Sequence, residues 1–213
     1  EIQRKKARIV ILEGTWWNTH EVPLVLPYFH ALEISHRAID ISHRTFRNAD
    51  DVSYYVSRIP KNSGVFLYFA CHGVDSELKP AGERSRISWV ALQEVLSSAK
   101  DGAISFIHFG CCEMVRSGAR RETLEPLLDI SGAKWVSGYT NEIGWLESML
   151  LDLALVSQVF VPFSWASDGR TAQLKRRATK FVENYEHLAR QLGFSALCRL
   201  TNKDLLIPSR LHS

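Results

Sequence analysis

Two hydrophobic runs of this sequence end in side chains that could act as a nucleophile and a base. The run VFLYFA is followed by CHG at 71–73, and the run AISFIHFG is followed by two cysteines at 111–112. A thiolate is a strong nucleophile, a nearby imidazole can exchange its proton, and backbone N–H groups at a glycine turn can hold an oxyanion. His72 and Cys112 are therefore candidates for a Cys–His dyad.

The dyad requires that the two runs form neighbouring strands of one parallel sheet. At the carboxyl ends of parallel strands the loops diverge and leave a crevice, and neighbouring strands lie about 4.8 Å apart. Successive strand residues point to opposite faces, so only one of Cys111 and Cys112 can face His72. We favour Cys112 as the nucleophile, with Cys111 as the alternative. Gly73 would let the chain turn and bring its N–H close to a substrate carbonyl.

The order of apolar runs and amphipathic segments indicates how these strands are arranged. Their alternation from end to end predicts an α/β fold, with a mostly parallel sheet of five or six strands and helices on both faces. We expect strands at 8–14, 33–42, 64–71, 103–110 and 134–138, and a possible last strand at 194–200. We expect helices that begin after Asn48 and Ser88, one that ends near Gly132, and two that cover 145–160 and 171–192. The polar stretch 75–87 is predicted to be an exposed loop.

The composition narrows the class of protein. The 213 residues, 46% of them hydrophobic, are enough for one sizeable core, so 1–213 is expected to be a single domain. With 26 Lys and Arg against 23 Asp and Glu the net charge is +3, and we expect no nucleic-acid or membrane partner. The apolar segment 145–160 is too short and too charged to span a bilayer and is predicted to be a buried helix.

The cysteines and the first residues bear on where the protein works. Of the four cysteines two are adjacent and none has C-x-x-C spacing, which is not a disulfide framework and is typical of a reducing compartment. The apolar run near the amino end is too short for a signal peptide, so we expect a cytoplasmic protein. Because the sequence begins with Glu1 rather than Met, we expect a piece of a longer protein whose flanking domains are missing.

Two other kinds of site are less consistent with the sequence. A zinc site from 71–72 and 111–112 would need two adjacent pairs to converge, against the usual ligand spacing of about two to four residues, so no metal is expected. The first strand ends in EGTWWNTH, without a G-x-G-x-x-G or P-loop motif, so we expect neither a nucleotide-binding domain nor a cofactor. Cys71 and His108 are interpreted as core residues rather than ligands.

The order of strand, ACHG, helix, strand and GCC resembles the caspase-like (clan CD) cysteine peptidases, the group that includes caspases, metacaspases, separase and the CHAT proteases. The resemblance covers roughly 8–160, and it places His72 before a glycine after one strand and Cys112 after the next. GCCE is similar to the ACE of CHAT domains, which makes these the nearest group by resemblance. The caspase QACRG block is missing, and Met114 and Val115 stand where CHAT domains have small residues.

The resemblance implies the caspase-like three-layer sandwich and a hydrolase, namely a cysteine endopeptidase that cleaves a protein or peptide substrate. It implies catalysis by His72 and Cys112, with an oxyanion hole formed by the N–H groups of Gly73 and Cys112. It also implies activation by a regulatory partner or ligand, and a role in bacterial-type defence or signalling. The alternative is a catalytically silent caspase-like interaction module.

The resemblance further places the first-subsite pocket after the first strand, around the dyad and after the fifth strand. The candidate pocket residues of this sequence are Glu13, Trp16, Trp17, Glu142 and Trp145. The glutamates could select a basic P1 residue and the tryptophans could wall an apolar one, and both possibilities stay open. The segments 74–87 and 113–121 follow the dyad directly and are expected to flank the site and to move on activation or substrate binding.

Overall fold

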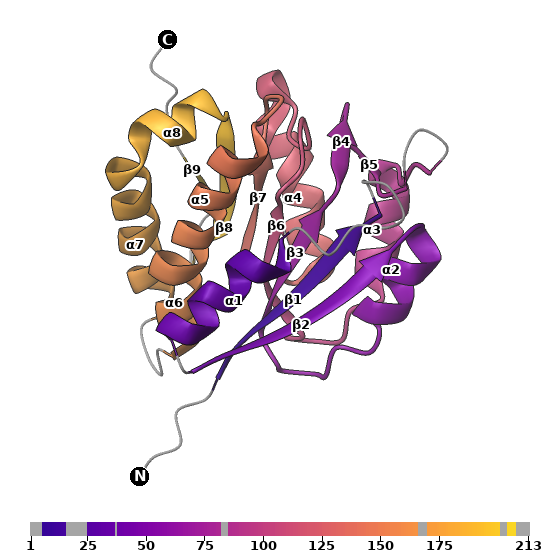
Figure 1. Ribbon diagram of the computed structural model, residues 1–213, viewed down its shortest axis with the longest axis horizontal. Helices are drawn as coiled ribbons and strands as arrows, with labels where there is room; N and C mark the ends of the chain where they lie inside the picture. Colours follow the sequence, from indigo (N-terminus) through magenta and orange to yellow (C-terminus); the bar gives the residue numbers. More distant parts are fainter. Residues whose placement is uncertain are drawn as a thin grey trace.

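The computed structural model describes residues 6–15, 25–36, 38–81, 85–165, 170–200 and 204–207. Over these residues the chain forms a seven-stranded sheet between two layers of helices (Figure 1). The strand order is β2-β1-β3-β6-β7-β8-β9. The first five strands are parallel, β8 pairs antiparallel with β7, and β9 pairs antiparallel with β8. These strands are β1 (Ala7–Gly14), β2 (Ile39–Phe46), β3 (Val65–Ala70), β6 (Ile104–Phe109), β7 (Trp135–Tyr139), β8 (Phe194–Arg199) and β9 (Asp204–Ile207). A separate hairpin consists of β4 (His72–Val74) and β5 (Glu77–Lys79).

The two helical layers bury different side chains of the same strands. One layer contains α1 (Leu26–Ser35), α5 (Trp145–Leu155), α6 (Val161–Trp165), α7 (Arg170–Asn184) and α8 (Glu186–Gln191), and the other contains α2 (Ala49–Val56), α3 (Trp89–Ser97) and α4 (Arg120–Ser131). In β3, Phe66 and Tyr68 pack in the core on the α5 side, whereas Leu67 and Phe69 pack in the core on the α2 side. β3 is therefore buried on both faces, as a central parallel strand should be.

Short polar signals fix the helix ends as the sequence predicts. The Asn48 side chain accepts a hydrogen bond from the backbone N–H of Asp51 at 2.9 Å, and Ser88 accepts one from Ala91 at 3.3 Å. Gly132 ends α4 with a φ of 66°, a left-handed conformation that costs glycine little. These caps fix ends of α2, α3 and α4, the helices that cover the Leu67 and Phe69 face of the sheet.

The predicted α/β architecture is confirmed, with differences at its edges. The sheet has seven strands rather than five or six, because β9 follows the predicted strand at 194–200 and adds one more at the edge. The predicted strand 33–42 is wrong in its first part, since α1 extends to Ser35 and β2 begins only at Ile39. The alternating letters EISHRAIDIS thus span the end of a helix and the start of an edge strand.

The stretch 75–87 is not an exposed loop. Its first residues belong to the β4–β5 hairpin, and Leu78 and Ile87 exchange two backbone hydrogen bonds, at 3.0 and 2.8 Å. Both side chains are buried in the core on the α2 side. Two apolar residues in this polar segment thus anchor it to the core. Residues 82–84 lie outside the described residues.

The helices of the carboxyl-terminal third also differ from the prediction. The expected helix 145–160 runs further, because α5 continues through a π-helical segment (Val156–Phe160, η2) into α6. The resulting Trp145–Trp165 helix has 21 residues and a mean hydropathy of 1.5, so by length and composition alone it could cross a membrane. Here it packs on the sheet, and the lack of a membrane partner stays a prediction. The expected helix 171–192 is divided at Tyr185 into α7 and α8.

Candidate active site

The two strand ends that carry the candidate dyad are neighbours in the sheet. β3 and β6 pair in parallel, with Phe69 opposite Phe109, and the N–H of Gly110 donates to the carbonyl oxygen of Phe69 at 2.9 Å. His72 and Cys112 therefore leave the sheet at the same edge. The His72 side chain is exposed and that of Cys112 is partly buried.

Gly73 lies directly against the turn that carries the thiol. A methyl group placed on Gly73 would come within 2.1 Å of the carbonyl oxygen of Cys112 and within 3.2 Å of the Cβ atom of Cys111. Contacts below about 3 Å to backbone are not found for real side chains, so only glycine fits at this position without a shift of the chain. The backbone of the histidine-bearing hairpin and the backbone of the cysteine-bearing turn are thus in contact.

The two adjacent cysteines have different surroundings. The Cys111 sulfur lies 3.8 Å from that of Cys71 and 3.4 Å from the carbonyl oxygen of Phe69, and both of these cysteines are buried. Burial, together with the contact to Cys71, raises the pKa of the Cys111 thiol well above its ordinary value. Cys111 is therefore part of the core on the α2 side, and of the two cysteines Cys112 is the one that solvent can reach.

One hydrogen bond to the Cys112 sulfur favours its thiolate form, whereas burial and several neighbouring groups disfavour it. The backbone N–H of Ile143 donates to its sulfur at 3.5 Å, which favours the thiolate. Burial nevertheless raises the pKa of this thiol, and the neighbouring Cys111, Glu142 and Glu113 raise it further. At neutral pH Cys112 is consequently a thiol, and a nucleophile has to be generated by removal of its proton.

Glu113 connects three segments around the thiol. Its N–H donates to the carbonyl oxygen of Asn141 at 3.1 Å, and its own carbonyl oxygen accepts from the N–H of Ser76 at 3.0 Å. Its φ of 51° is unusual for a residue other than glycine. Strain of this kind persists only where the surroundings enforce it. Glu113 therefore links the β4–β5 hairpin to the segment that follows β7. Cys112 is the residue directly before Glu113.

The candidate pocket residues are brought together only in part. Glu142 is exposed and acts electrostatically on Cys112, as described above. Trp145 begins α5, and its ring meets that of Tyr28 edge to face with centroids 5.0 Å apart. Trp16 and Trp17 lie outside the described residues. Of these candidate pocket residues, Glu142 is the one whose charge acts on the Cys112 thiol.

Glu13 is engaged by other side chains. It is 3% exposed, its Oε2 atom lies 2.8 Å from Nε2 of His43, and its Oε1 atom accepts from the N–H of Val25 at 3.4 Å. β1, which carries Glu13, is separated from β6 by β3. The carboxylate is therefore used within the fold, between β2 and the start of α1, which makes it less suited than Glu142 to bind a substrate cation.

A buried polar network beneath the site was not predicted from the sequence. Asp152 of α5 approaches His108 Nε2 at 2.5 Å and accepts from the Tyr68 hydroxyl at 2.7 Å, and it also accepts from the Tyr139 hydroxyl. The other ring nitrogen of His108 lies 2.7 Å from the Ser137 hydroxyl. The only sequence signals were a histidine inside an apolar strand and an aspartate inside an apolar helix.

The order Ser137, His108, Asp152 has the connectivity of a serine-hydrolase triad, but its setting is not catalytic. Ser137 and His108 are 0% exposed and Asp152 is 1% exposed, so no substrate can reach the hydroxyl. The Ser137 oxygen also accepts from the indole N–H of Trp135 at 2.7 Å. These groups satisfy one another inside the core, and His108 is a bonded core residue, as its position in the strand predicts.

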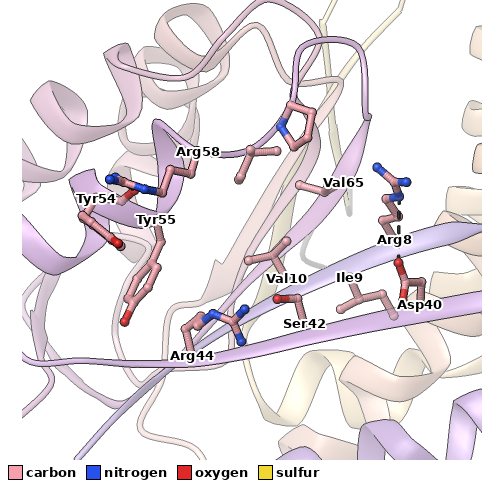
Figure 2. A pocket seen from close by; sticks show the side chains of 12 residues that line it. Arg8, Ile9, Val10, Asp40, Ser42, Arg44, Tyr54, Tyr55, Arg58 and Val65 are labelled. Atoms are coloured by element: carbon pink, nitrogen blue, oxygen red, sulfur yellow. Dashed lines mark hydrogen bonds and ion pairs between the residues drawn. The ribbon is translucent and has the colours of Figure 1, made fainter.

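A separate cleft of about 390 Å³ lies away from the dyad (Figure 2). It is formed by β1, β2 and the end of α2, and Val65 lines it at the start of β3, whereas His72 follows the carboxyl end of that strand. In Figure 2 the Arg58 side chain lies over the Tyr54 ring, at 3.4 Å from its centroid, and Arg8 faces Asp40 at 3.9 Å. Arg58 and Arg8 are thus partnered within the protein, and the cleft contains no candidate site residue.

Among the residues that the structure describes, no group of three or more His, Cys, Asp or Glu side chains could hold a metal ion. The pairs at 71–72 and 111–112 do not converge on one point, because the Cys111 side chain is buried in the α2-side core and the His72 side chain is exposed.

Comparisons with known proteins find similarity at the level of structure. No protein-family model matches the chain, and no curated protein matches it. The X-ray structure of an inactive zymogen C11 protease from Parabacteroides distasonis is similar over 93% of this chain, with a TM-score of 0.55 and 14% sequence identity. Caspase-1 from Spodoptera frugiperda is similar over 86% of this chain and 78% of its own, with a TM-score of 0.47 and 10% identity.

The similarity to the C11 protease concerns the fold. This chain spans 63% of the length of that structure. At 14% identity the match confirms the expected caspase-like α/β fold, with helices on both faces of a mostly parallel sheet, and leaves the activity and the site residues to be argued from this chain. A particular closeness to CHAT proteases is not part of what the comparisons found.

Proposed function

We propose that this protein is a cysteine endopeptidase in which Cys112 is the nucleophile and His72 is its acid–base partner. The observation that carries the proposal is the contact between Gly73 and the Cys112 carbonyl, because it joins the histidine-bearing and cysteine-bearing strand ends at one edge of the sheet. The similarity of the fold to a C11 protease supports it. Among the caspase-like peptidases, we propose the CHAT proteases as the group that this protein resembles most.

The proposed reaction uses the chain's own groups in two steps. The proton of the Cys112 thiol passes to His72, the sulfur attacks the scissile carbonyl carbon, and the N–H groups of Gly73 and Cys112 hold the oxyanion. His72 then gives its proton to the leaving amine as the peptide bond breaks. Water hydrolyses the resulting thioester, with His72 as the base, and restores the free thiol.

Proton removal from Cys112 is the step that the surroundings oppose. Because burial and the nearby carboxylates favour the neutral thiol, the resting site holds little thiolate. Substrate or a regulatory partner that places a positive charge beside Glu142 or Glu113 would reduce that opposition. We therefore propose an enzyme whose activity depends on occupancy of the site, in a cytoplasmic setting where thiols stay reduced.

A basic P1 residue is the substrate feature that the charges support best. Glu142 is exposed and close enough to act on the Cys112 sulfur, whereas Glu13 is bonded to His43. A lysine or arginine side chain beside Glu142 would neutralise one of the charges that disfavour the thiolate. Binding of such a substrate would therefore also help to generate the nucleophile.

The second candidate is a catalytically silent caspase-like module, and the raised pKa of Cys112 favours it. Turnover of a peptide library that varies P1, compared between the unchanged chain and Cys112→Ala, separates the two. A peptidase loses all turnover in this variant. A chain that shows no turnover with any P1 residue, or the same turnover in both forms, supports the silent module or another nucleophile.

A further inference from the structure

Asp152 fastens helix α5 to three strands of the sheet at once. Its carboxyl group contacts Tyr68 of β3, His108 of β6 and Tyr139 of β7, and these groups are all buried. The Tyr139 hydroxyl also reaches the carbonyl oxygen of Ser148 in α5 at 3.4 Å. The network therefore fixes the first two turns of α5 relative to the strand ends.

The Asp152 carboxyl group has three hydrogen-bond partners. Both tyrosine hydroxyls donate to it, and Nε2 of His108 lies within hydrogen-bond distance of it. The Ser137 hydroxyl oxygen accepts from the Trp135 indole N–H and also contacts Nδ1 of His108. The polar groups of this buried network are therefore paired with one another.

The same network borders the turn that leads to the thiol. A methyl group on Gly110 would come within 2.1 Å of the Tyr68 hydroxyl oxygen and 3.0 Å of Oδ2 of Asp152. Gly110 is two residues before Cys112. Gly110, the first residue after β6, thus lies directly against the Tyr68–Asp152 pair.

The amino end of α5 lies at Cys112 itself. Ile143, whose N–H donates to the Cys112 sulfur, directly precedes Gly144, the N-cap of α5. A helix amino terminus carries partial positive charge, which favours a nearby thiolate. Whatever fixes α5 against the sheet therefore fixes both the donor and the dipole that favour negative charge on this sulfur.

On the basis of the function proposed above, we propose that Asp152 is a positioning residue that holds the amino end of α5 against Cys112. It touches neither substrate nor sulfur. It acts through α5, by keeping the Ile143 N–H within reach of the sulfur on which negative charge develops during attack. The other groups that act on this sulfur are Cys111, Glu113 and Glu142, with His72 as the proposed base.

The rate of Cys112 alkylation as a function of pH, measured on the full chain by mass spectrometry, tests this role without any substrate. In Asp152→Ala the Ile143 donor is released, and the midpoint of the profile moves upward by about one pH unit, because a hydrogen bond to a charged group is worth about 1.5 kcal/mol. At neutral pH the rate falls about tenfold. If Asp152 acted only as a negative charge, its removal would lower the midpoint instead.

Two further variants separate positioning from loss of stability. Asp152→Asn keeps the shape and an acceptor oxygen, so its midpoint stays at or slightly below that of the unchanged chain. Thr123→Ala removes a buried hydroxyl of α4 that donates to the carbonyl oxygen of Ala119, the N-cap of that helix, and it lowers stability without moving the midpoint.

If Asp152→Ala does not fold, Tyr139→Phe serves in its place. It removes the hydroxyl that bonds both Asp152 and Ser148, and it raises the midpoint by a smaller amount. A folded Asp152→Ala or Tyr139→Phe variant with an unchanged or lowered midpoint overturns the positioning role. Failure of the proposed peptidase activity would show separately, as absence of peptide turnover in the unchanged chain.

Discussion

Gly73 and Cys112 come from two different strand ends and pack so closely that no side chain fits between them. A methyl group on Gly73 would lie 2.1 Å from the Cys112 carbonyl oxygen, although the two residues are far apart in the sequence. The contact exists because β3 and β6 are neighbouring parallel strands whose ends face the same edge. The proposed oxyanion hole depends on it, since the N–H groups of these two residues would have to point at one atom.

Gly73→Ala should therefore lower peptide turnover at least about tenfold, because the added methyl group forces the two strand ends apart. It should also reduce the free energy of unfolding by about 1–3 kcal/mol, as overpacking does. The matched control is Gly132→Ala at the end of α4, since a methyl group there would meet nothing within 4 Å while the φ of 66° would still cost stability. Equal turnover in the two variants would show that the contact has no role in catalysis.

The four cysteines should differ sharply in reactivity in the folded protein. Cys71, Cys111 and Cys198 are buried and Cys112 is partly exposed, so a small alkylating agent should label Cys112 first. The rate should rise with pH beyond the ordinary thiol value, because burial raises the pKa of Cys112. Site-resolved mass spectrometry measures this, and labelling of Cys111 as fast as Cys112 would reverse the assignment of the nucleophile.

Much of this site could be predicted from the sequence because its parts are local. Each strand end is marked by an apolar run followed directly by the reactive residue, and the alternation of sheet faces separates Cys111 from Cys112 in principle. The hairpin of residues 72–79 was missed, since only Leu78 and Ile87 mark it within a polar stretch.

The interactions that could not be predicted join residues far apart in the chain. Asp152 is 84 residues from Tyr68 in the sequence and 44 residues from His108. No local sequence pattern indicates that these side chains are hydrogen-bond partners. The pairing of Glu13 with His43 depends in the same way on β1 and β2 lying side by side in a particular register, which places Glu13 opposite Thr45. The periodicity of a strand predicts which face is buried but does not identify its neighbour.

The free energy of unfolding should fall in strong alkali, because two tyrosines are buried in the folded protein. Burial, and then the Asp152 carboxylate, raise the pKa of Tyr68 and of Tyr139 well above the ordinary value of about 10. Above that pH the unfolded chain loses these protons while the folded chain keeps them, so the free energy of unfolding falls by about 1.4 kcal/mol per pH unit for each tyrosine.

The buried cysteines add their own loss from about pH 8.5, because burial also raises the pKa of Cys111 and raises that of Cys198 to about 12. Denaturant unfolding at several pH values measures the slope. Tyr68→Phe should remove one tyrosine's share of the slope above pH 10 and leave the slope between pH 8.5 and 10 unchanged. An unchanged slope above pH 10 in this variant would contradict the buried-tyrosine account.

Glu142→Gln should weaken the proposed preference for a basic P1 residue. The exposed carboxylate would contribute up to about 1 kcal/mol to a substrate cation, so the ratio of kcat/KM for P1 arginine to kcat/KM for a neutral P1 residue should fall about fivefold. For the neutral P1 residue itself kcat/KM should not fall, because Glu142 no longer raises the pKa of Cys112. The control is Glu94→Gln, which removes an exposed carboxylate from α3 on the other face of the sheet. If kcat/KM for basic and neutral substrates changed by the same factor, Glu142 would not determine the P1 preference.

The most direct test of the proposed dyad is to measure peptide turnover and Cys112 alkylation together in His72→Ala. Turnover should be abolished, because no group remains to protonate the leaving amine. Alkylation of Cys112 should persist at alkaline pH, since a thiol without substrate needs no partner in order to ionise. Full peptidase activity in this variant would contradict the assignment of His72 and Cys112 as a catalytic dyad.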